Sequence, residues 1–216
     1  MKYINMGKVF SVLTMLIGLG ISGVYAQDYY GSTYSSKKVN LGITLAPSMS
    51  WLRYGNQEDR ENQAKMGYAY GLLADFGLSE NYYFSTGFLV NTLKAQTKAD
   101  MAPNSLTYQL QYVEIPFGLK LQSTQRYYRS YYGQFGFSAG FKINAQQYEP
   151  ESEKVSLGNN ANALRLGLQI GGGINWQLDH KLTMMTGLSL NNGFTQVMKE
   201  GKPKNSYVAF NFAIFF

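Results

Sequence analysis

The chain has 216 residues, of which 19 are Lys or Arg and 13 are Asp or Glu, for a net charge of +6. It contains no cysteine, which excludes a disulfide framework, and its basic residues are scattered, which argues against nucleic-acid binding. Gly (23), Tyr (18) and Phe (13) are abundant while the mean hydropathy is only −0.23, a value too low for a bundle of membrane-spanning helices.

The first 26 residues have the pattern of a cleavable secretory signal. Lys2 and Lys8 precede an apolar run over residues 9–21, and Ala26 stands at the expected cleavage site. The run is shorter than the roughly 20 apolar residues that a spanning helix needs. We therefore expect a signal peptide over 1–26, a flexible periplasmic leader over 27–37, and one domain over 38–216.

Alternation of apolar with small or polar residues predicts eight β-strands in this domain. In chain order the segments are 39–46, 67–78, 82–93, 106–122, 131–144, 164–178, 182–191 and 206–216. The clearest is 164–178, where even positions are apolar apart from Gly172 and odd positions are all Gly or polar. An even number of such strands predicts an all-β protein, an eight-stranded antiparallel transmembrane β-barrel.

Segment 106–122 is the irregular one. Residues 113–121 keep their apolar side chains on odd positions, but Tyr108 and Leu110 stand on even ones. Pro116 also lacks the N–H that a strand needs for its ladder. A bulge or a strained pairing is expected here.

The connections between the segments alternate in length. Segments 79–81, 123–130 and 179–181 are short or moderate turns, whereas 53–65, 96–105, 145–162 and 192–205 are long and polar. Short periplasmic turns and long extracellular loops are the layout of outer-membrane barrels, so both termini are expected in the periplasm of a bacterial outer-membrane protein.

A soluble, lipocalin-like barrel is the structural competitor, and the glycines argue against it. Gly weakens a strand and has no evident use on a water-facing surface, but in a narrow barrel it makes room inside. Aromatic residues near the strand ends are expected to form two interfacial girdles. They are Tyr82, Phe84, Tyr127, Tyr128, Tyr131 and Trp176 by the short turns, and Trp51, Tyr54 and Tyr68 by the long loops.

The C-terminal segment and two internal motifs suggest a family. Apolar residues at Val208, Phe210, Phe212, Ile214 and Phe216 resemble the terminal signal read by the barrel-assembly machinery. Residues 112–120, Tyr-Val-Glu-Ile-Pro-Phe-Gly-Leu-Lys, resemble the Tyr-x-Glu-Ile-Pro strand of the PorT-like family of bacterial outer-membrane β-barrel proteins, and residues 132–136 resemble its next strand. The resemblance implies a barrel. The best-known members serve type IX secretion and gliding, but no motif assigns this chain to that subset.

Four charged residues fall on the expected inward face, namely Glu114, Lys120, Lys142 and Arg165. Lys142 and Arg165 are expected on neighbouring strands near the loop end, with Glu114 as the nearest counter-charge. An ion-pair network that plugs the lumen is the first interpretation, and a ligand or proton pathway is the alternative. Open conduction is not expected, because side chains fill the interior of eight strands.

Signals for enzyme chemistry are weak, so we predict no catalytic activity, metal or cofactor. The single histidine, His180, stands in a short turn beside Asp179, and Ser138 and Ser189 have no second histidine to activate them. The acidic segment 56–62 lacks the spacing of a calcium loop and is expected to be a solvated loop, with divalent-cation or lipopolysaccharide binding as the alternative. Gly171 to Gly173 lie within a strand, where a bend or tight packing of the wall is expected.

Three functional hypotheses follow. The leading one is a non-catalytic outer-membrane component that assists protein secretion or surface assembly, with outer-membrane lipids, lipopolysaccharide, the assembly machinery and secretion components as partners. A structural or adhesive barrel acting through its loops is the first alternative. A lipid-active enzyme is the second, disfavoured by the missing catalytic set.

Overall fold

The computed structural model describes residues 39–55, 60–99, 106–148, 155–157, 160–199 and 201–216. The expected signal peptide and leader lie outside this part of the chain. The described strands are β1 (Val39–Arg53), β2 (Arg60–Ser79), β3 (Tyr82–Ala99), β4 (Leu106–Gln122), β5 (Arg129–Tyr148), β6 (Val155–Ser156), β7 (Leu164–Gln177), β8 (Thr183–Gln196) and β9 (Lys204–Phe215). Within the described ranges no helix is long and apolar enough to span a membrane.

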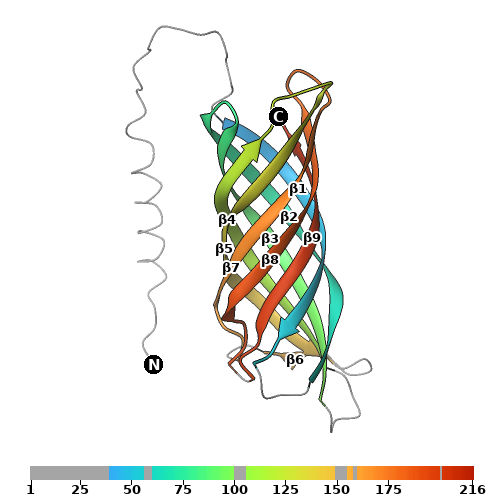
Figure 1. Ribbon diagram of the computed structural model, residues 1–216. Helices are drawn as coiled ribbons and strands as arrows, with labels where there is room; N and C mark the ends of the chain where they lie inside the picture. Colours follow the sequence, from blue (N-terminus) through green and yellow to red (C-terminus); the bar gives the residue numbers. More distant parts are fainter. Residues whose placement is uncertain (1–38, 56–59, 100–105, 149–154, 158–159, 200) are drawn as a thin grey trace, which may run out of the picture. The chain divides into compact units, whose positions relative to one another are not determined.

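Eight long strands close into an antiparallel barrel (Figure 1). Each pairs with its neighbour in sequence, β5 pairs directly with β7, and β1 closes the ring by pairing with β9. The two-residue β6 only extends the loop end of β5. The predicted fold class is thereby confirmed.

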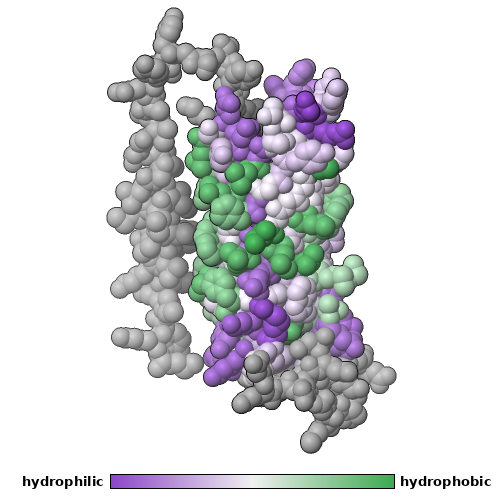
Figure 2. Space-filling model, viewed as in Figure 1, coloured by the Kyte–Doolittle hydropathy of each residue, from purple (hydrophilic) through white to green (hydrophobic). Residues whose placement is uncertain are grey.

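The alternation seen in the sequence places apolar side chains outside and small or polar ones inside. On β9, for example, Phe210 and Phe212 are exposed whereas Ala209 and Ala213 are buried. A band of hydrophobic residues crosses the visible outer face between two more polar ends (Figure 2). A barrel in lipid needs an apolar outer face, and its interior can be polar. Closure of the sheet also leaves no strand edge unpaired in the lipid.

The strands extend further toward the long-loop end than the apolar pattern predicts. Segments 60–65, 96–99, 145–148 and 192–196 belong to strands, although their polar composition suggested loops. β2 and β5 have 20 residues each, about twice the 9–11 that cross a bilayer. Period-2 hydrophobicity ends where lipid contact ends, but backbone pairing continues beyond it.

β4 is irregular, as expected, but for two separate reasons. In the pairing with β5, Gln111 faces Asn144 while Tyr112 faces Lys142, so β5 carries one extra residue at Ile143. In the pairing with β3 the register is unbroken, but the ladder is interrupted at Pro116, whose carbonyl accepts a hydrogen bond from Thr86 Oγ1 at 2.8 Å.

Tyr108 and Leu110 do not mark a change of face. Even-numbered β4 residues point into the lumen throughout, and Leu110 and Tyr112 are only 2% and 0% exposed. These side chains are apolar because they fill the loop end of the interior, packing against Ala145 among others.

Most of the expected girdle residues lie outside, but Tyr54 does not. Tyr82, Tyr131 and Tyr68 are exposed on the outer surface. Tyr54 continues the inward parity of Ser50 and Leu52 and packs against the interior apolar cluster, so its assignment to the girdle was wrong.

The turn between β4 and β5 holds two tyrosines in an uncommon backbone conformation. Arg126 and Arg129 exchange both backbone hydrogen bonds, and the two residues between them, Tyr127 and Tyr128, have φ of 47° and 62°. Positive φ at both central positions is the geometry of a tight type I′ hairpin, which usually uses Asn and Gly. Gln177 N–H donates to the Tyr128 carbonyl at 2.7 Å and ties this turn to β7.

Inward glycines should be far less replaceable than outward ones. A Cβ at Gly167 would lie 2.3 Å from Asn191 Oδ1, which hydrogen bonds hold in place, whereas a Cβ at Gly133 would meet nothing within 4 Å. We expect Gly167→Ala to lower the free energy of unfolding by about 1–3 kcal/mol through overpacking. The matched control Gly133→Ala should change it by less than about 0.5 kcal/mol. Urea unfolding in lipid vesicles measures both, and equal effects would contradict the assignment of faces.

Candidate functional site in the barrel interior

An apolar cluster fills the loop end of the lumen. Leu52, Leu93, Leu110 and Val197 are at most 2% exposed and come from β1, β3, β4 and the loop after β8. Tyr54, Tyr108 and Leu157 pack against the same cluster. This end of the interior is therefore a hydrophobic plug built by the wall and the loops.

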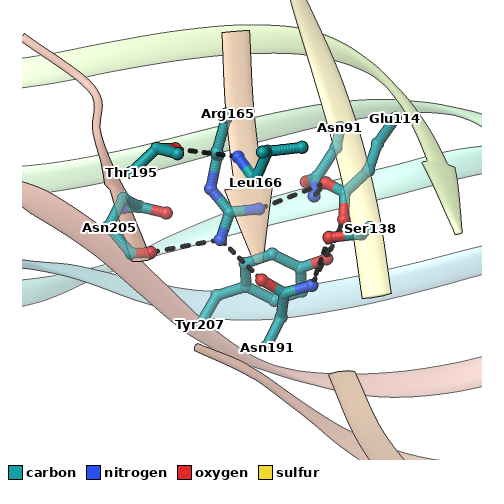
Figure 3. A network of polar contacts seen from close by, with 9 residues as sticks. All are labelled: Asn91, Glu114, Ser138, Arg165, Leu166, Asn191, Thr195, Asn205 and Tyr207. Atoms are coloured by element: carbon teal, nitrogen blue, oxygen red, sulfur yellow. Dashed lines mark hydrogen bonds and ion pairs between the residues drawn. The ribbon is translucent and has the colours of Figure 1, made fainter. Parts of the chain in front are cut away.

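A charged pair lies next to this plug. Glu114 of β4 and Arg165 of β7 are 1% and 0% exposed, and Arg165 Nη1 lies 3.8 Å from Glu114 Oε2. Burial of two charges is unfavourable unless they are paired and their remaining atoms are hydrogen-bonded. Figure 3 shows how the surrounding side chains converge on them.

Hydrogen bonds from three strands hold the Glu114 carboxylate. Asn91 Nδ2 donates to Oε2 at 2.8 Å, and the Tyr207 hydroxyl donates to Oε1 at 2.8 Å. A longer contact of 3.4 Å comes from Asn191 Nδ2 to Oε1. These donors belong to β3, β9 and β8, so the carboxylate connects its own strand to three others.

Arg165 is held in a similar way from the other side. Its Nη2 donates to Asn191 Oδ1 at 2.6 Å and to the Asn205 carbonyl at 3.1 Å. Its guanidinium carbon lies 5.2 Å from the centre of the Tyr207 ring, within the range of a cation–π contact. Asn191 in turn donates to Ser138 Oγ at 2.7 Å, which brings β5 into the network. Six of the eight long strands therefore meet at this one level.

A second charged pair lies toward the short-turn end. Lys120 Nζ is 2.7 Å from Asp75 Oδ2, and the two side chains are 3% and 5% exposed. Asp75 also accepts a hydrogen bond from Ser85 Oγ at 2.6 Å. The ammonium lies 5.0 Å from the ring centre of Tyr132 and 4.8 Å from that of Phe215, so aromatic faces and a carboxylate surround this cation.

A small cavity lies beside the second pair. It offers about 50 Å³ to water, and its lining includes Lys120, Gln134, Gln169 and Asn211. A cavity of this size with several polar groups in its lining can hold a few water molecules. The described interior thus consists of an apolar plug, a charged network, a small chamber with a mixed lining and a second ion pair.

The structure brings two of the four expected lumen residues together. Glu114 and Arg165 form a pair, as described above. Lys142 does not join this pair, and its Nζ donates instead to the Ala161 carbonyl at 2.5 Å. Lys120 pairs with Asp75, which sequence reasoning did not single out although it stands on the inward parity of its segment.

The residues considered for enzyme chemistry have structural contacts. Asp179 Oδ1 accepts from the backbone N–H of the exposed His180 at 2.7 Å, which stabilises their turn. Ser138 accepts from Asn191, and Ser189 accepts from Asn211 Nδ2 at 2.9 Å. In the part of the chain that the structure describes, no group of three or more His, Cys, Asp or Glu is placed to hold a metal ion.

The remaining sequence features fall on the wall or outside the described part. Gly171 to Gly173 lie within β7. The five residues of the expected assembly signal, Val208, Phe210, Phe212, Ile214 and Phe216, all lie on the outer surface. Of the acidic segment 56–62, positions 56–59 lie outside the described residues.

Comparison with known proteins identifies the family. The model of the outer membrane protein beta-barrel domain matches residues 25–199. The chain belongs to this family. It is therefore an outer-membrane β-barrel protein, whereas its assignment to the PorT-like group stays a prediction. No curated protein sequence gives a significant match.

Several solved barrels resemble the chain at low identity. Neisserial surface protein A is 7% identical, with 82% of this chain and 97% of that one covered and a TM-score of 0.48. Ail, the attachment invasion locus protein of Yersinia pestis, is 11% identical, with 83% of this chain and 99% of that one covered and a TM-score of 0.42. OprG from Pseudomonas aeruginosa is 8% identical, with 82% of this chain and 96% of that one covered and a TM-score of 0.45.

Breaking the Glu114–Arg165 pair should destabilise the barrel strongly. Glu114→Gln keeps the shape of the side chain but leaves the Arg165 guanidinium without its counter-charge. Arg165→Met leaves the Glu114 carboxylate without its counter-charge. We expect each to lower the free energy of unfolding in lipid vesicles by about 3–5 kcal/mol, and the double variant to lose much less than their sum.

Gln169→Met is the control for that experiment, since Gln169 lines the chamber and carries no charge. It should cost less than about 1.5 kcal/mol. Additive losses in the double variant would show that the two charges do not stabilise each other.

Proposed function

We propose that this outer-membrane barrel is a non-catalytic accessory component of protein secretion or surface assembly, and that it acts through its ends rather than its lumen. The observation that carries the proposal is the filled interior, in which Leu110, Glu114, Arg165 and Lys120 are all at most 3% exposed. A lumen occupied in successive layers by fixed side chains leaves the loops, turns and outer wall as the surfaces that can meet a partner.

The orientation is part of the proposal. The short-turn end, with the C-terminal Phe216, would face the periplasm, and the long connections would face outward, as is usual for outer-membrane barrels. Residues 112–120 resemble a strand of the PorT-like family, whose best-known members serve type IX secretion, and this resemblance is what connects the chain to secretion.

Adhesion through the loops is the second candidate, and the strand lengths favour it. β2 and β5, at 20 residues each, carry the loop end beyond the apolar band as a continuous sheet. A rigid sheet of this kind holds binding loops away from the membrane surface.

A clean deletion separates the two candidates. In a secretion role, mass spectrometry of secreted and surface-attached proteins should show broad loss of exported cargo, restored by the wild-type gene. Complementation with residues 149–154 replaced by a Gly-Ser linker of equal length tests whether that segment is required. An unchanged cargo profile, with loss only of attachment to host or matrix surfaces, would overturn the secretion role and leave the adhesive one.

A further inference from the structure

The outer surface at the loop end carries an unusual pairing of like charges. Arg53 of β1 and Lys204 of β9 stand directly opposite each other in the antiparallel ladder, and both side chains are exposed. Like charges at directly opposed positions destabilise a sheet. An arrangement of this kind becomes favourable when an anion lies between or above the two cations.

Further cations gather around this pair. Lys199 and Lys202, in the connection from β8 to β9, are exposed as well, and Lys202 has a φ of 44°. The connection is tight, since Val197 N–H donates to the Pro203 carbonyl at 2.8 Å. Among the described residues no carboxylate forms an ion pair with Arg53, Lys199, Lys202 or Lys204. We call these four residues the cationic rim.

The side chain of Arg53 is already positioned for a ligand. Its Nη2 donates to Asn192 Oδ1 and, at 2.9 Å, to the Gly193 carbonyl, so it reaches across β9 to β8. Ser206 of β9, 2% exposed, donates to the same Asn192 oxygen at 3.1 Å. The guanidinium is therefore fixed over the outer face, where its planar fork suits a phosphate.

The height of the cationic rim matches the level of lipid headgroups. Along β1, Arg53 is followed toward the membrane by Trp51 and then by Met49, which is 53% exposed. Along β9, Lys204 is followed by Ser206 and then by the exposed Val208. At about 3.3 Å per residue along tilted strands, the two cations lie roughly 10 Å beyond the apolar band. Long Arg and Lys side chains at this height reach the interfacial layer.

We propose that the cationic rim binds the phosphates of an outer-leaflet glycolipid, the lipid A part of lipopolysaccharide. The site is a permanent membrane contact that fixes the barrel's height and rotation in the outer leaflet. It rests on the orientation given under the proposed function, with the long connections outward, but not on a role in secretion. Lipid A supplies two phosphates on a rigid disaccharide, and this charge suits the four cations of the rim better than a single phosphodiester does.

The chain provides its own reporter of binding. It has two tryptophans, and Trp51 lies on the strand that carries Arg53, whereas Trp176 lies near the short turns. Trp176→Phe leaves Trp51 as the sole indole next to the cationic rim. Its fluorescence can be titrated in the full-length mature protein, folded in a zwitterionic detergent, with bisphosphorylated lipid A as the probe.

We expect saturable binding of lipid A in this background and a loss of about tenfold or more in affinity in Arg53→Gln/Lys204→Gln. The charge-preserving variant Arg53→Lys/Lys204→Arg should retain most of the affinity. Arg126→Gln/Arg129→Gln removes two cations at the opposite end and should bind as the parent does. Heat-shifted gel mobility verifies that each variant is folded.

Four further outcomes decide the proposal. Monophosphorylated lipid A should bind more weakly than the bisphosphorylated form, and Lys204→Gln without lipid should be at least as stable as the parent because the like-charge contact is gone. Phosphatidylglycerol bound as tightly as lipid A would overturn the glycolipid assignment, because it would indicate general attraction to anionic surfaces. Unchanged lipid A affinity in the double Gln variant would overturn the site itself. Neither result would bear on secretion, which the deletion tests separately.

Discussion

A charge inside a narrow barrel has to be neutralised by the wall that surrounds it, and the middle of this protein is organised by that constraint. Glu114 and Arg165 stand on strands separated by β5, and both side chains are buried. Glu114 Oε2 lies 3.8 Å from Arg165 Nη1. Each needs further polar partners, because a partly satisfied buried ion is more unfavourable than an apolar side chain. Asn91, Asn191 and Tyr207 supply them for the carboxylate, and Asn191 also accepts from Arg165 Nη2, whereas Arg165 Nε and Nη1 have no hydrogen-bond partner among the described residues. With Ser138, which accepts from Asn191, six strands are connected at one level of the lumen.

The neighbouring layers follow from the same constraint. Toward the loops the wall provides leucines and the connection after β8 provides a valine, which need no partner and exclude water from the network. Toward the turns Lys120 pairs with Asp75 and lies over the rings of Tyr132 and Phe215. The small inward glycines belong to this arrangement as well, since at Gly167 even one methyl group would meet the amide of Asn191.

The periodicity of the sequence was sufficient to predict the number of strands, their faces and the class of barrel. It predicted strand ends poorly, because backbone pairing continues through polar segments such as 60–65, which lie beyond the apolar part of their strands. Tyr54 was misassigned for a related reason, since an aromatic residue near a strand end can face either the interface or the lumen, and parity decides which. Asp75 stood on the inward parity and could have been found by listing every charge on that face. The contact of Lys142 could not be predicted in this way, because its acceptor is the backbone carbonyl of Ala161, in the connection before β7.

The interior and the two ends of the barrel have different roles. The lumen gives stability and fixes the strand register, and the surfaces at either end are free to vary with the partner. The cationic rim fits this division, since Arg53 and Lys204 stand on the strands that close the barrel yet face away from its interior.

The sealed lumen is the central claim, and electrical recording tests it most directly. The mature protein, folded in detergent and inserted into a planar lipid bilayer, should give no stable conductance steps in molar salt, because the plug and the two ion pairs leave no continuous water path. Folding of the inserted protein would be verified by its heat-shifted mobility on gels. Reproducible ohmic steps from such protein would contradict the account, since ions would then be crossing a lumen that the side chains should close.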